Sequence, residues 1–113
     1  MRRMIKPVVF LGDTRKRLRA FPEDAKAVAG SELLRVQRGE EPRDAKSMTS
    51  VGVGVREIRV QLGEQYRVIY VAKFEEAVYV LHCFQKKTQQ TAPTDVDLAR
   101  RRFNALVKER TVL

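Results

Sequence analysis

From Val55 the chain alternates apolar and polar residues, the period of two that is typical of a half-buried β-strand. One face of this strand is apolar, and the other carries Glu57, Arg59 and Gln61. Turn residues then lead to a return strand at 66–73 and to a third strand at 77–84. The third strand is apolar on both faces, which indicates a central place in the sheet. Residues 55–84 therefore predict a meander of three antiparallel strands.

The segments before this meander predict one more strand and two helices. A β-branched run at 6–11 predicts a strand, and a short, strongly basic helix follows it. Pro22 fits the first position of a second helix, whose apolar residues recur every three or four positions until Gly39 ends it. Residues 40–54 contain proline, serine and two glycines without any period, so we expect a loop there.

A third helix is predicted at the end of the chain. Thr94 and Asp97 have the spacing of a capping box, and the apolar residues that follow fall on one stripe. The chain therefore reads as a small α+β domain, residues 1–113, with a single core. We expect a small antiparallel sheet, made of the first strand and the meander, with two N-terminal helices and one C-terminal helix.

The composition narrows the classes of function. A net charge of +9 favours polyanionic partners such as nucleic acid, anionic lipid or an acidic protein. No apolar run is long enough to span a membrane or to form a signal-peptide core, so we expect a cytoplasmic protein. One cysteine and one histidine exclude an internal disulfide and mechanisms that need two imidazoles. We expect neither a metal nor another cofactor.

Arginines on the first two strands of the meander are the first candidates for a binding surface. Arg67 lies in mid-strand, where a rigid backbone can hold a guanidinium for bidentate contact with a phosphate. An exposed, solubilising arginine is the commoner alternative. Arg56 and Arg59 lie on opposite faces of the neighbouring strand, so at most one of them shares a surface with Arg67. Arg59 is on the polar face and is the better candidate.

Lysines near the sheet extend this candidate cluster. Lys86 and Lys87 follow the third strand, and Lys46 lies in the loop before the meander. These lysines either close a cationic cluster with the arginines or belong to ordinary polar loops. His82 has a side chain suited to general base catalysis, but its apolar strand favours a hydrogen-bonded core histidine. Cys83, beside it, is expected to be a small buried hydrophobe.

RNA cleavage is a reaction that such a surface can support without a metal or a thiol. The ribose 2′-OH is an internal nucleophile, so the protein has to align it, help to remove its proton and stabilise the pentavalent phosphate. Arginine and lysine supply the last of these effects. The alternative is a protein that binds nucleic acid without cutting it.

Six features recur together along nearly the whole chain: FLGD (10–13), FPED (21–24), Lys46, REIR (56–59), YRVIY (66–70) and the run YVLHCFQKKTQQTAPTDVDLARRR (79–102). On these features the chain resembles the RelE/ParE toxin superfamily and, within it, the phage-derived HigB-like branch. The run at 79–102 is close to the branch signature LHxFxKKTxxTP and is the most specific. The resemblance implies a RelE-like fold.

The resemblance also implies that the protein is the toxin of a type II toxin–antitoxin system. Such a toxin is a ribosome-dependent mRNA endonuclease, and a helix-turn-helix, HigA-like antitoxin neutralises it. By resemblance, Arg67 matches the strand arginine that stabilises the scissile phosphate, and Lys87 or Lys86 matches the basic residue after the last strand. Arg59 matches a basic strand position, whereas Glu57 falls where some relatives are basic. The catalytic tyrosine of some relatives has no counterpart here. Gyrase-directed relatives share the fold, so a gyrase target is the alternative.

Overall fold

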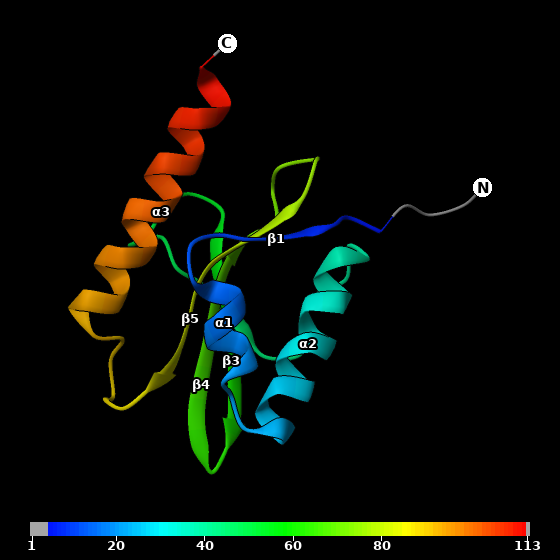
Figure 1. Ribbon diagram of the computed structural model, residues 1–113, viewed down its shortest axis with the longest axis vertical. Helices are drawn as coiled ribbons and strands as arrows, with labels where there is room; N and C mark the ends of the chain where they lie inside the picture. The colour runs from blue at the N-terminus through cyan, green and yellow to red at the C-terminus, as the bar shows by residue number, and fades with distance from the viewer. Residues whose placement is uncertain (1–4, 113) are drawn as a thin grey trace.

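The computed structural model describes residues 5–112, so residues 1–4 and 113 of the expected domain lie outside its described part (Figure 1). Within residues 5–112, five strands form one mixed sheet and three helices pack against it, which confirms the predicted α+β class. The sheet has the strand order β1-β5-β4-β3-β2. The elements are β1 (Val8–Phe10), α1 (Thr14–Arg19), α2 (Glu23–Gln37), β2 (Ala45–Ser47), β3 (Val55–Leu62), β4 (Glu64–Val71), β5 (Val78–Lys86) and α3 (Pro93–Thr111).

The three-strand meander is present as predicted. β3 pairs antiparallel with β4 around Gly63, whose φ of +73° suits a glycine turn. β4 pairs antiparallel with β5, with a register shift next to Ile69. β5 lies between β4 and β1, so the strand that is apolar on both faces is an inner strand of the sheet.

Two features of the sheet differ from the expectation. β1 pairs with β5 in parallel, Val8 opposite Val78, so the sheet is mixed and not wholly antiparallel. β2 forms within the segment expected to be a loop, and it pairs antiparallel with the middle of β3. A three-residue strand such as β2 is too short to show a period. The direction of β1 is set by its pairing with β5, which lies far along the chain. Neither feature leaves a local pattern in the sequence.

Two helix starts also need correction, while the predicted helix end is confirmed. Pro22 is the N-cap of α2 and not its first residue. α3 begins at Pro93 with Ala92 as N-cap and no side-chain cap, so the capping box predicted at Thr94 is wrong. Proline is favoured at the first helical position, which moves the start one residue before Thr94. Gly39, with a φ of +79°, follows the end of α2 as predicted.

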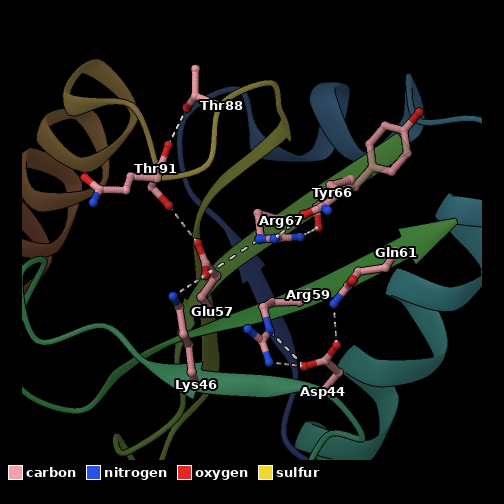
Figure 2. A network of polar contacts seen from close by, with 11 residues as sticks. Asp44, Lys46, Glu57, Arg59, Gln61, Tyr66, Arg67, Thr88 and Thr91 are labelled. Carbon is pink, nitrogen blue, oxygen red and sulfur yellow. Dashed lines mark hydrogen bonds and ion pairs between the residues drawn. The ribbon is translucent and has the colours of Figure 1, made fainter. Parts of the chain in front are cut away.

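The two faces of the sheet are covered by different helices (Figure 1). α1 and α2 pack on one face, where Leu33 and Ala29 join Ile58 and Val80 in one buried cluster. α3 packs along β5 on the other face, in a second cluster that includes Phe103. On this second face, β2 and the ends of β3 and β4 near Gly63 carry polar side chains instead (Figure 2). Val55, Ile69 and Val71, at the other ends of β3 and β4, belong to the second cluster. Between residues 5 and 112, no helix has the length and apolarity needed to cross a bilayer.

Candidate nucleic-acid interface

The register of β3 and β4 brings two of the predicted arginines together. Arg59 and Arg67 are direct partners across the two strands, so both belong to the face that α1 and α2 do not cover. Arg56 pairs with Tyr70 in register and lies on the opposite face, where it contacts Glu41. The alternation of side chains along the strand predicted this separation. Arg56 is therefore not part of the surface around Arg67. We use "polar face" for the side chains of Asp44, Lys46, Glu57, Arg59, Gln61, Gln65 and Arg67.

A buried ion pair lies at the centre of the polar face. Arg67 Nε is 3.7 Å from Glu57 Oε1, and the two side chains are 3% and 0% exposed. The Arg67 guanidinium donates hydrogen bonds to the Tyr66 carbonyl at 3.0 Å and to Gln65 Oε1 at 2.7 Å. Burial lowers the pKa of Arg67, and the carboxylate of Glu57 opposes that shift. Arg67 is thus a fixed charge beneath the surface and not a mobile surface arginine.

Side chains from β2 and from the loop after β5 cover Glu57 (Figure 2). Lys46, the register partner of Glu57, places its Nζ 4.0 Å from Glu57 Oε1. Thr91 Oγ1 donates a hydrogen bond of 3.2 Å to Glu57 Oε2. Among the described residues, Glu57 Oε1 and Arg67 Nε are buried without a hydrogen-bond partner. Buried polar atoms without a hydrogen-bond partner cost free energy. A polar ligand that bonded to Glu57 Oε1 or Arg67 Nε would remove that cost.

Arg59 lies nearer the surface than Arg67 and has a different partner. Its Nε donates a hydrogen bond of 2.8 Å to Asp44 Oδ1, and Gln61 Nε2 donates one of 3.0 Å to Asp44 Oδ2 (Figure 2). The side chains of Arg59 and Asp44 are 36% and 38% exposed. An ion pair this exposed is worth about 1 kcal/mol at most. A phosphate can therefore replace Asp44 as the partner of Arg59 at little cost.

Lys86 and Lys87 extend the positive surface at the end of β5. Lys86 is the register partner of Gln65 and is half-buried, whereas Lys87 is exposed. Burial lowers the pKa of Lys86, and the positive charge of Arg67 adds to this shift, so the two cations act on each other. Lys86 and Lys87 also line a cavity of about 180 Å³ with Phe84 and Asp95. The predicted lysines therefore border the polar face.

His82 lies in the interior, bound to α3. Its Nε2 is 2.7 Å from Asp95 Oδ1, its ring stacks on Phe84, and only 1% of the side chain is exposed. Burial lowers the pKa of His82, and Asp95 opposes the shift. This is the hydrogen-bonded core histidine expected from the strand pattern. Its role in proton transfer stays a prediction.

Comparison with known families adds to this geometry. The family model described as Phage derived protein Gp49-like (DUF891) matches residues 16–104. The chain belongs to this family. The Gp49-like family is part of the RelE/ParE-like toxin family, so the resemblance is confirmed at that level. A search of curated proteins found no significant match. Every predicted site residue lies inside the matched span of this Gp49-like chain.

The sequence did not reveal how the Gp49-like site is closed. Glu57 was placed on the polar side of its strand, but its complete burial comes from Lys46 and Thr91, which lie in distant segments. Asp44, the partner of Arg59, and Gln65, the partner of Arg67, lie in segments whose sequence gave no sign of these contacts. Pairing of oppositely charged residues across strands could have hinted at Lys46 and Glu57, had β2 been predicted.

Proposed function

We propose that this chain is the toxin of a type II toxin–antitoxin system, of the HigB-like kind, and that it cuts mRNA on the ribosome. One observation carries the proposal: Arg59 and Arg67 lie opposite each other on adjacent strands, with Lys46 and Lys86 around them. This cationic face belongs to a member of a toxin family. Arginine and lysine on a rigid sheet are the groups that RNA-phosphate chemistry requires.

The exposed cations would hold the RNA backbone. Lys46 and Lys87 are exposed, and Arg59 can exchange Asp44 for a phosphate. Such contacts position the RNA without reading its sequence, and they make binding sensitive to salt. Arg56 lies on the other face and takes no part in this surface.

The buried pair would act on the reacting atoms. The ribose 2′-oxygen attacks the adjacent phosphorus and the bond from phosphorus to the 5′-oxygen breaks, which leaves a 2′,3′-cyclic phosphate and a 5′-hydroxyl end. Arg67 stabilises the charge of the pentavalent phosphate, and Glu57 Oε1, which has no hydrogen-bond partner among the described residues, takes the 2′-hydroxyl proton. Both side chains are covered, so the loop carrying Thr91 has to leave Glu57 before RNA reaches them.

The leaving 5′-oxygen takes a proton from the Lys86 ammonium, whose lowered pKa favours the release of that proton, and solvent protonates the amine again afterwards. Lys86 and Lys87 lie at the border of the polar face and line a cavity with Asp95. Asp95 in turn holds His82. His82 is therefore placed to influence this step through Asp95, without direct contact with RNA. No cofactor takes part in the proposed reaction.

The partners follow from the same proposal. The substrate is mRNA on the translating ribosome, so the protein acts in the cytoplasm. A helix-turn-helix, HigA-like antitoxin would neutralise it. The net charge of +9 suits a toxin that binds RNA and is neutralised by an acidic surface.

Induction of the wild type and of Arg67→Ala in cells, followed by mapping of mRNA 5′ ends, tests the proposal. We expect growth arrest with codon-phased cuts in the wild type and the loss of both in the variant. Arg38→Ala removes an equal charge at the end of α2, and it should behave as the wild type. Growth arrest with intact mRNA would contradict the proposal. If a DNA-damage response accompanied that arrest, the gyrase-directed alternative would gain support.

A further inference from the structure

A second groove lies on the other side of the sheet from the polar face. It has a volume of about 390 Å³ and lies between α1 and the paired ends of β4 and β5. Phe21 and Tyr66 form an aromatic wall that is 8% and 6% exposed, with ring centroids 4.8 Å apart and ring planes tilted by 47°. Arg17, half exposed, and Gln85, half-buried, supply the polar groups of the lining. The groove thus combines an aromatic wall with an amide and with a guanidinium that now pairs with Asp13.

This groove shares two lining residues with the cavity at the lysine pair. Phe84 and Gln85 line both of them. Gln85 pairs with Tyr66 and Lys86 pairs with Gln65, so consecutive residues of β5 face opposite sides of the sheet. In the described part of the chain, β1 pairs with β5 only as far as Val80, and no strand flanks the outer edge of β5 beyond it. An extended ligand can therefore pass round this edge from the lysines into the groove.

The chemistry of the groove matches an unpaired nucleobase. A base has flat apolar faces and an edge of donors and acceptors, and proteins bind it with aromatic side chains, arginine planes and amides. The Gln85 amide has both a donor and an acceptor, and it now donates to Glu64 at the surface. The cations at either end, Arg17 and the Lys86–Lys87 pair, suit the phosphates on each side of such a base.

We propose that this groove binds one unpaired base of the RNA whose phosphate lies at Lys86 and Lys87. The inference rests on the proposed function and adds to it a base-specific contact, supplied by Arg17 and Gln85 against the wall of Phe21 and Tyr66. The polar face then holds the backbone, and the groove fixes which nucleotide lies at the scissile phosphate.

The test uses short single-stranded RNAs in which an abasic nucleotide replaces each position in turn. Affinity is measured by fluorescence anisotropy for the wild type and for a variant with Arg17→Ala and Gln85→Ala. At one position, we expect the missing base to weaken wild-type binding about fivefold or more. The variant should bind the intact RNA about threefold to tenfold more weakly, and it should show little further loss at that position. Arg15→Ala, on the same helix but over Phe10, should keep the wild-type profile.

Equal abasic penalties in the wild type and the variant would overturn the inference, and a groove that serves a protein segment would give that result. An RNA with 4-thiouridine at the sensitive position supplies a second measurement on the unmodified protein. We expect cross-links to Phe21 or Tyr66, and cross-links confined to other parts of the chain would also contradict the inference. If the abasic penalty depends on Arg17 and Gln85 but mRNA is not cut in cells, the proposed function is contradicted and the base-binding site is still supported.

Discussion

Arg67 and Glu57 meet on the polar face, with Arg67 Nε 3.7 Å from Glu57 Oε1 and neither side chain more than 3% exposed. Two charges so deeply buried cost free energy to desolvate, and here the pairing is incomplete, because one atom of each group has no hydrogen bond among the described residues. A hydrophobic pair of similar volume would fill the same space without this desolvation free energy. The pair is therefore better explained by chemistry than by stability.

Removal of one partner should be strongly destabilising. We expect Arg67→Ala to lower the free energy of unfolding by about 3–5 kcal/mol, because the buried charge of Glu57 loses its buried partner and keeps only Lys46 at 4.0 Å and the hydroxyl of Thr91. Arg67→Met combined with Glu57→Met should return close to wild-type stability, since two apolar side chains replace the pair. Urea denaturation followed by circular dichroism measures both. A loss below about 1 kcal/mol in Arg67→Ala would show that the pair is solvated.

The same double variant separates folding from activity. It should fold and yet cause neither growth arrest nor mRNA cleavage, because both groups assigned to the reacting atoms are gone. Toxicity at the wild-type level in this variant would remove Arg67 and Glu57 from the mechanism. This comparison guards against reading the loss of activity in Arg67→Ala as a catalytic effect when the cause is unfolding.

Release of Arg59 from Asp44 should strengthen RNA binding. Asp44→Asn removes a negative charge from the polar face and weakens the exposed ion pair, which frees the guanidinium for phosphate. We expect about a threefold gain in affinity and a steeper dependence on salt. Anisotropy titrations with a short RNA at several salt concentrations measure both quantities. Glu40→Gln, which removes the same charge beside Arg35, is the matched control. Equal affinities for Asp44→Asn and this control would argue against a role for Arg59.

Stability should fall in mildly acidic solution because of His82. Burial lowers its folded-state pKa below the usual 6.5, so the unfolded chain binds a proton more readily than the folded one. The stability is fully present above about pH 6.5 and is lost as the pH falls through the lowered folded-state pKa. Melting temperatures at a series of pH values should show this decline in the wild type and a flatter profile in His82→Gln. Identical profiles in the two proteins would contradict the burial of a neutral imidazole.

Cys83 should be unreactive in the folded protein. Burial raises the pKa of its thiol to about 12, so little thiolate exists near neutral pH. Iodoacetamide should modify the thiol slowly in the native protein and rapidly after denaturation in urea. Mass spectrometry follows the reaction. Modification of the native protein at the rate of a free cysteine would mean that β5 opens readily.

Local patterns in the sequence were enough to predict the three-strand meander that carries the two arginines of the candidate site. The period of two in β3 placed Arg59 on the polar side of its strand and separated it from Arg56, as the structure shows. The apolar run of β5 indicated an inner strand, and its neighbours confirm that place. These predictions succeeded because alternation along a strand fixes the face of each side chain.

Long-range contacts decided what the sequence could not predict. β2 owes its existence to pairing with β3, and Lys46 and Thr91 bury Glu57 from two distant segments. The parallel pairing of β1 likewise depends on where the chain returns after the helices. A carboxylate on the polar side of a strand looks exposed in the sequence, and only the folded chain shows that it is enclosed with Arg67.

The central claim is that the polar face cuts mRNA on the ribosome. A reconstituted translation reaction with purified protein, analysed by primer extension on a defined message, tests it most directly. We predict cuts in phase with the codons when ribosomes translate the message, and none on the same RNA without ribosomes. The protein with Arg67→Met and Glu57→Met should leave the message intact in both reactions. A fully intact message with translating ribosomes and wild-type protein would contradict the account.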